Sequence, residues 1–352
     1  MSSPGLSERM SSPGLSEPIT MPQLSLSVLD QSVSLAGSSE DAAIRDTLAL
    51  AQHCEGLGYA RFWVSEHHGL PTIIGSAPEI LMAAIAARTT RIRIGSAGVM
   101  LPHYSALKVA EQFRVLEALA PGRIDLGVGR APGSDMRTAR ALNPNAQAAA
   151  DDFPEQVRDL QAWTALPVHQ GISAHPLGPH APELWILGSS NYGAQLAAHF
   201  GLPYAYAYFF VDGQGADEAL AVYRRLYRPS ERHPQAHATV CVWALAADTH
   251  EAATHHALGR ERWRVDRARG VIGPLQSPDV IAARGFAADE WPTVEAMRRK
   301  AFVGTGAQVA DQLRALALEL QLDEIVINTW AFDPAARRHS YALLAREFGL
   351  SV

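Results

Sequence analysis

The chain has 352 residues and a formal net charge of −6, with 47 % hydrophobic and 19 % charged residues. This balance is typical of a globular protein with a substantial core, and the acidic charge disfavours binding to nucleic acid or to an anionic membrane. No apolar run approaches the roughly 20 residues that a membrane-spanning helix needs. The two cysteines, Cys54 and Cys241, fit neither a disulfide framework nor a zinc-ligand spacing, which favours a cytoplasmic protein.

The first residues contain a repeated segment. "MSSPGLSE" occurs at residues 1–8 and again at residues 10–17. A repeat of Ser, Pro and Gly cannot bury apolar surface, so residues 1–21 are predicted to be a disordered tail. A basic segment followed by an apolar one is missing, so we expect no secretory signal peptide. Residues 22–352 are predicted to form one domain.

From Leu24 onward, short apolar and β-branched runs alternate with longer helical stretches. Asp41 and Ser105 are predicted to cap helices, and Pro334 after Asp333 is predicted to start the last helix. Eight parallel strands alternating with helices favour a closed (β/α)8 TIM barrel over an open doubly wound sheet. The predicted strands are residues 24–30, 60–66, 91–101, 123–129, 183–188, 203–210, 239–247 and 323–330.

Two connections are too long to be simple loops. Residues 131–152 follow the fourth predicted strand, and residues 265–304, approximately, follow the seventh. Insertions of this size within a compact domain usually cover a functional site. Residues 260–270, "RERWRVDRARG", contain five arginines, and the interleaved Glu261 and Asp266 favour a solvated helix face.

In a (β/α)8 barrel the active site forms at the carboxyl ends of the strands. Polar residues follow most of the predicted strands here, and this combination is the strongest functional signal in the sequence. The strand ends concerned are residues 30–32, 66–68, 98–103, 129–130, 188–190, 208–210 and 328–330.

"SEHH" ends the second predicted strand. Side chains alternate along a strand, so His67 and His68 point to opposite sides and only one can readily face the barrel. A metal site at this dipeptide is disfavoured, and the helical H-E-x-x-H motif is absent. The remaining interpretations are a histidine that acts as acid, base or hydrogen-bond donor, which we favour, and a pair of structural histidines.

Two glycine-containing segments indicate ligand contacts. In "WILGSSNYGAQLAAHFG" a buried strand ends at Gly188, and a helix begins directly after Ser189 and Ser190. Free amides and hydroxyls at a helix start favour an anion, although an ordinary serine cap is the alternative. "GVGRAPG" misses the dinucleotide-binding spacing and is interpreted as a tight turn, with Arg130 as a ligand contact or as a partner of Asp135.

Together these segments resemble the bacterial luciferase-like flavin monooxygenases. The resemblance covers residues 24–349 and rests on "GYARFWVSEHHG", "RIRIGSAGVMLPHYSALKVAEQF", "LWILGSSNYGAQLAA" and "GTGAQVADQLRAL". It implies a TIM barrel that binds reduced FMN at the carboxyl ends of its strands. The flavin would react with O2 to form a 4a-hydroperoxide that oxygenates a small organic substrate, and a flavin reductase would supply the FMNH2.

The resemblance also implies roles for single residues. His67 matches the catalytic histidine, Arg130 matches an arginine of the flavin pocket, and residues 188–190 (Gly188, Ser189 and Ser190) match the flavin-phosphate loop. A non-prolyl cis peptide is expected at Ala97–Gly98, beside the flavin. The chain departs from luciferase at Gly129, where luciferase has a cysteine, and residues 147–160 contain no clear match to its second phosphate arginine.

Other readings remain open on the same fold. One is a hydride-transfer enzyme that uses the deazaflavin F420, or a flavin reductase; another is a non-catalytic flavin-binding protein, against which the presence of His67 weighs. The family usually forms dimers through the helices after strands two and three. Here those helices, within residues 76–88 and 105–120, are rich in small and apolar residues, which predicts a homodimer.

Overall fold

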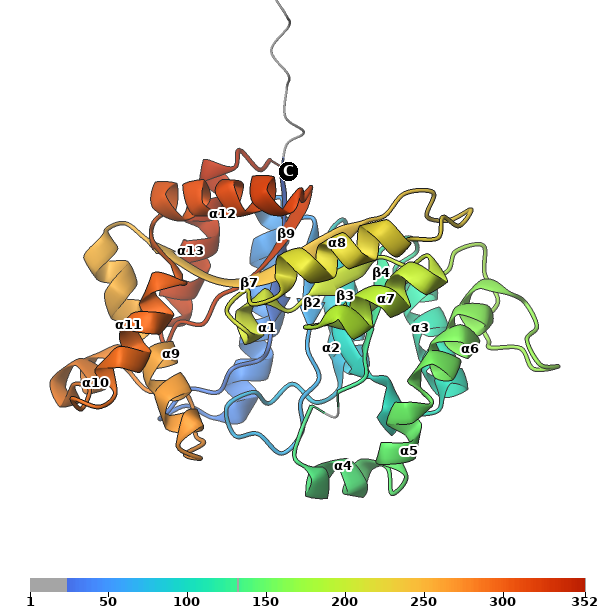
Figure 1. The fold of residues 1–352 in the computed structure, drawn as a ribbon, viewed down its shortest axis with the longest axis horizontal. Coiled ribbons are helices and arrows are strands. Elements are labelled where there is room, and N and C mark those ends of the chain that lie inside the picture. Colours follow the sequence, from blue (N-terminus) through green and yellow to red (C-terminus); the bar gives the residue numbers. More distant parts are fainter. Residues whose placement is uncertain (1–23, 132, 352) are drawn as a thin grey trace, which may run out of the picture.

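The computed structural model describes residues 24–131 and 133–351, and the predicted tail at residues 1–21 lies outside them. Eight parallel strands pair side by side, and β9 pairs with β1 to close a barrel (Figure 1). The (β/α)8 architecture and the places of the eight predicted strands are confirmed, but the sixth ends at Tyr206, and Tyr208–Phe210, predicted as its end, form the short 3-10 helix η2. The barrel strands are β1 (Ser25–Asp30), β2 (Arg61–Val64), β3 (Arg93–Met100), β4 (Ile124–Gly129), β5 (Glu183–Gly188), β6 (Tyr204–Tyr206), β7 (Ala238–Ala247) and β9 (Glu324–Asn328).

Helices surround the barrel. Asp333 caps the last helix through the amide of Ala335, with Pro334 in its first turn, as predicted. Ser105 occupies the predicted N-cap position of α3, but its side chain forms no capping hydrogen bond. Asp41 was predicted as a cap but lies inside the first turn of α1, after Ser39, where a carboxylate favours the helix dipole. The surrounding helices are α1 (Glu40–Gly56), α2 (Pro78–Ala86), α3 (Ala106–Leu119), α6 (Phe153–Ala165), α7 (Asn191–Phe200), α8 (Ala216–Leu226), α12 (Gly306–Leu320) and α13 (Pro334–Glu347).

The two insertions are largely helical and lie on separate sides of the barrel, in green and in orange in Figure 1. The first contains α4 (Met136–Leu142) and α5 (Ala146–Asp151). The second contains α9 (His250–Ala268), α10 (Pro278–Arg284), α11 (Trp291–Arg299) and β8 (Phe302–Thr305). Strand β8 was not predicted, and among the described strands it pairs with the end of β7 alone.

The arginine-rich segment of α9 is not the solvated face that the sequence favoured. Arg262 is 2 % exposed and bonds to Glu290 at 2.8 Å and to Asp266 at 2.6 Å. Glu290 comes from the residue before α11, so this ion pair holds the second insertion together. The prediction failed because the carboxylate partner lies 28 residues away in the chain, outside any local charge pattern.

Charged side chains fill the amino-terminal end of the barrel. Arg61 forms ion pairs with Asp125 at 2.9 Å, with Glu324 at 3.0 Å and with Glu183 at 3.4 Å. The buried indole of Trp63 also donates to Asp125. Buried charges are tolerated when they are paired in this way. This end of the barrel is therefore a closed structural network, and the carboxyl end is left for ligands.

Three observations bear on broader function classes. Among residues 24–131 and 133–351, no helix combines the length and apolar character needed to cross a membrane. The same residues contain no group of three or more histidine, cysteine or acidic side chains arranged to hold a metal ion. Cys54 and Cys241 are both free and buried, and burial raises the pKa of each thiol.

Candidate active site

The peptide bond between Ala97 and Gly98 is cis, as predicted. At this point the register between β3 and β4 shifts, between Ser96 and Val99. A Cβ atom on Gly98 would lie 2.4 Å from the Leu187 side chain and 2.7 Å from the carbonyl oxygen of Gly127. The close approach of β3, β4 and β5 therefore requires glycine at residue 98.

His67 and His68 follow the end of β2 and contact different neighbours. Nδ1 of His67 lies 3.2 Å from the hydroxyl of Ser65, whereas Nε2 of His68 lies 2.7 Å from the carboxylate of Glu66. Trp63, two residues before Ser65, packs in the barrel interior. Alternation continued from Trp63 through Ser65 would place His67 on the inward-facing side and His68 on the other.

The imidazole of His67 is neutral at pH 7. Burial lowers its pKa to about 4, and the nearby cation of Arg267 also disfavours the protonated form. A neutral imidazole can donate one hydrogen bond and accept another. Since one ring nitrogen contacts Ser65, the second is the one available to other groups.

Glu66 is a positioning residue whose individual role the sequence did not reveal. It is 1 % exposed, and its carboxylate accepts hydrogen bonds from the amide of Met100 at 2.9 Å and from the hydroxyl of Tyr104 at 2.7 Å. With the contact to His68, Glu66 joins the end of β2 to the end of β3. In the sequence, the one indication that Glu66 matters was its position beside two histidines, directly after an apolar strand.

Arg130 lies against the start of α7. Its guanidinium stacks on the Tyr192 ring, 4.1 Å from the ring centroid. Tyr192 is the second residue of α7 and follows the Gly188–Ser190 segment by two residues. Within the described ranges Arg130 has no ion pair with Asp135, which instead caps α4 through the amide of Thr138. The structure therefore brings together two regions that the sequence singled out separately.

The start of α7 has the features of an anion site. Ser190 precedes the helix in an extended conformation, and its side chain forms no capping hydrogen bond to the first amides. The carbonyl oxygen of Ser190 accepts a hydrogen bond from Tyr204 at 3.2 Å, which holds the segment in place. Free amides at a helix start and an adjacent arginine both favour a negatively charged group. Gly188, Ser189, Ser190 and Arg130 thus fit the phosphate of a flavin mononucleotide.

Gln31 joins β1 to β9 at the carboxyl end. Its side-chain oxygen accepts hydrogen bonds from Asn328 at 2.6 Å and from the indole of Trp330 at 3.0 Å. These three residues were all predicted at strand ends. Asp30, one residue earlier, is oriented differently and pairs with Arg337 of α13 at 2.8 Å. Asp30 therefore stabilises the contact between the barrel and α13 and does not line the site.

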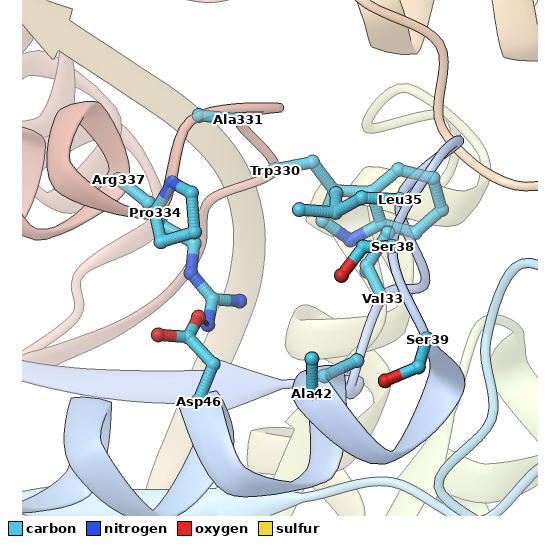
Figure 2. A pocket seen from close by; sticks show the side chains of 11 residues that line it. Val33, Leu35, Ser38, Ser39, Ala42, Asp46, Trp330, Ala331, Pro334 and Arg337 are labelled. Carbon is cyan, nitrogen blue, oxygen red and sulfur yellow. Dashed lines mark hydrogen bonds and ion pairs between the residues drawn. The ribbon is translucent and has the colours of Figure 1, made fainter.

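A small cavity lies between α1 and α13 (Figure 2). Its volume is about 60 Å³, and it is lined by residues that include Val33, Asp46, Trp330 and Arg337. Ligand pockets usually measure about 300–1,000 Å³. In Figure 2 the side chains of Asp46 and Arg337 lie side by side, and they form an ion pair. This cavity is too small for a flavin and belongs to the packing of the two helices.

Comparison with known proteins identifies the family. The model of the luciferase-like monooxygenases matches residues 24–322. The chain belongs to the luciferase-like monooxygenase family. A luciferase-like monooxygenase of Escherichia coli is 38 % identical over 318 residues, which cover 90 % of this chain and 95 % of that protein.

Solved structures agree with this family assignment. The crystal structure of apo-MsnO8 superposes with a TM-score of 0.87 at 34 % identity and covers 93 % of this chain and 99 % of that one. The FMN complex of the oxygenating component of 3,6-diketocamphane monooxygenase from Pseudomonas putida has a TM-score of 0.68 at 17 % identity, with coverages of 93 % and 98 %. An F420-dependent secondary alcohol dehydrogenase has a TM-score of 0.64 at 14 % identity, with coverages of 91 % and 97 %. The last two show the shared fold alone.

Proposed function

We propose that this luciferase-like protein is an FMN-dependent monooxygenase that oxygenates a small organic substrate. The observation that carries the proposal is the presence, at one end of the barrel, of an anion site and a buried neutral histidine. The anion site comprises Arg130 and the start of α7, and the histidine is His67. Reduced FMN would supply the two electrons with which O2 yields one oxygen atom to the substrate and one molecule of water.

The phosphate of FMN would bind at the start of α7. The amides of the first turn and the hydroxyls of Ser189 and Ser190 would donate hydrogen bonds, and Arg130 would supply a positive charge. Ala97 and Gly98 would lie beside the ring system, where the absence of a bulky side chain allows close approach of the backbone.

His67 would act on the reacting groups through the ring nitrogen that does not contact Ser65. A neutral imidazole can accept a proton or donate a hydrogen bond to a developing negative charge. Glu66 would position this histidine indirectly, because it holds the adjoining backbone of β2 against Met100 and Tyr104.

The experiment that tests this function is a measurement of oxygen uptake with FMNH2, FADH2 and reduced F420, with and without a panel of organic substrates. Uptake coupled to oxygenated product with FMNH2 supports the proposal. Oxidation of reduced F420 that transfers hydride to a substrate without consuming O2 would replace it with the dehydrogenase alternative. A flavin reductase added with NADH would supply FMNH2 in this assay. We propose that the protein is cytoplasmic and that a flavin reductase supplies its FMNH2 there too.

A further inference from the structure

Two of the five arginines in residues 260–270 form no ion pair with a carboxylate in the part of the chain that the structure describes. Arg262, Arg264 and Arg269 form ion pairs with acidic side chains. Within residues 24–131 and 133–351, Arg260 and Arg267 form no ion pair; Arg260 lies over the Trp243 ring at 4.3 Å, and Arg267 lies over the Trp263 ring at 5.1 Å. An unpaired guanidinium against an indole keeps its donors free for a ligand.

These arginines lie at the carboxyl end of the barrel. Trp243 follows Cys241 by two residues on β7, and Cys241 faces the barrel interior, so Trp243 is on the same side and nearer the strand end. Trp263 of α9 packs on Trp330, which follows β9, with ring centroids 4.8 Å apart. Arg260, Trp263 and Arg267 are spaced three and four residues apart and therefore share one face of α9, next to the proposed reaction site.

Trp243 also has an unsatisfied donor. Its side chain is 5 % exposed, and its Nε1 atom is buried without a hydrogen-bond partner. Buried polar atoms are nearly always paired, so an unpaired one requires an explanation. The guanidinium of Arg260 stacks on this same indole ring. The Trp243 N–H and the Arg260 N–H groups are therefore two hydrogen-bond donors that lie close together.

The charge around Arg260 is positive. The nearby carboxylate of Asp212 is bound by Arg264 through both oxygens, at 2.7 Å each. Arg260 and Lys300 also contribute to the lowered pKa of Asp212. Glu261, the other carboxylate that acts on Arg260, is bound by Arg298 at 2.8 and 2.7 Å, so both carboxylates already have a bound arginine. Burial and the proximity of Arg264 lower the pKa of Arg260 to about 9, which leaves it a cation at neutral pH. An additional anion would balance this charge.

We propose that Arg260 and the indole N–H of Trp243 bind a carboxylate on the organic substrate, whose apolar part lies against the tryptophans of α9 and β9. The proposal rests on the oxygenase function above and names its substrate class. This place is separate from the start of α7, since β6 lies between β5 and β7 in the barrel. A guanidinium prefers a carboxylate because its parallel N–H groups match the two oxygens.

The test is equilibrium binding to the flavin-free protein, which needs no turnover. Octanoate and octanamide are titrated by calorimetry into the wild-type protein and into Arg260→Gln, Trp243→Phe and Arg284→Gln. Arg284→Gln is the matched control, because Arg284 is an exposed arginine of α10 in the same insertion. We expect the wild type and the control to bind octanoate at least tenfold more tightly than octanamide. Arg260→Gln should reduce this preference to about twofold or less, and Trp243→Phe should reduce it in part.

A second titration separates the substrate carboxylate from the flavin phosphate. FMN and riboflavin are titrated into the same variants, and Arg260→Gln should leave the preference for FMN unchanged. A loss of FMN preference in that variant would assign Arg260 to the phosphate and overturn the proposal. Equal binding of octanoate and octanamide to the wild type would also overturn it. If octanoate preference is present but O2 uptake is absent, the oxygenase function fails and the anion site stands.

Discussion

The hydroxyl of Tyr104 donates a hydrogen bond of 2.7 Å to the carboxylate of Glu66, and this contact spans two strand ends. Glu66 follows β2, and Tyr104 lies just after the short 3-10 helix η1 (Leu101–His103) that follows β3. The same carboxylate accepts the amide of Met100, so the loops after β2 and β3 are held together beside His67. His67, which we propose as the catalytic residue, and Glu66, which joins the two loops, are thus neighbours in sequence with different contacts.

Removal of this carboxylate should destabilise the fold. Glu66→Ala leaves the amide of Met100 and the hydroxyl of Tyr104 without a buried acceptor, and each loss costs about 1–3 kcal/mol. We expect the free energy of unfolding, measured in urea, to fall by about 2–4 kcal/mol. Tyr104→Phe removes one donor to the Glu66 carboxylate, which keeps the Met100 amide and His68 as partners, and should cost about 1 kcal/mol. A larger effect of Tyr104→Phe than of Glu66→Ala would contradict this role.

His67→Ala should reduce oxygenation by about 10²-fold or more and leave flavin affinity within several-fold, because the loss of a positioned acid or base has this size. Turnover is measured with saturating FMNH2, and affinity by flavin fluorescence. His68→Ala is the comparison, since the His68 imidazole contacts the carboxylate of Glu66. Unchanged turnover in His67→Ala would remove the histidine from the mechanism.

The lowered pKa of His67 predicts a pH dependence of stability. The folded state keeps His67 neutral down to about pH 4, whereas the unfolded chain protonates near pH 6.5. The unfolded state therefore binds more protons between these values, and stability falls as pH falls through this window. Between pH 7 and pH 4.5 the wild type should lose about 2–3 kcal/mol more unfolding free energy than His67→Asn. If the unfolding free energies of the two proteins change with pH in parallel, the prediction of a lowered His67 pKa is wrong.

For the phosphate site, the double replacement of Ser189 and Ser190 by alanine should weaken FMN binding far more than riboflavin binding. Arg130→Gln should weaken FMN by about tenfold or more, because it removes a charge-assisted hydrogen bond. Dissociation constants for both flavins are measured by fluorescence quenching. Equal losses for FMN and riboflavin would indicate that these residues contact the ring system and not the phosphate.

We also predict a homodimer through α2 and α3. Ile80 on α2 is 66 % exposed, and Val115 and Leu119 on α3 are 48 % and 60 % exposed, so both helices present large apolar side chains to solvent. Sedimentation at micromolar concentration should show a dimer, and Ile80→Lys combined with Leu119→Lys should yield a monomer. Leu318→Lys on α12, equally exposed at 65 %, is the matched control and should remain dimeric. A monomeric wild type would refute the prediction.

The sequence by itself determined the barrel, and it predicted a site at the carboxyl ends of the strands. Runs such as residues 183–188 are short, apolar and followed by a helix start. These are local properties, so they can be recognised in the sequence without knowledge of the fold. Alternation within "SEHH" separated His67 from His68, and the order of the motifs matched a known family closely enough to place the cis peptide at Ala97–Gly98.

Only the tertiary structure decided which polar side chains are paired and which are free. Gln31 faces Asn328 whereas Asp30 pairs with Arg337, and both partners are about 300 residues away in the chain. For the same reason the sequence could not distinguish the five arginines of residues 260–270. The structure shows that Arg262 binds Glu290, whereas Arg260 stacks on the indole of Trp243. Hydrogen bonds and ion pairs depend on distances of a few ångströms between segments, and a one-dimensional pattern contains no such distances.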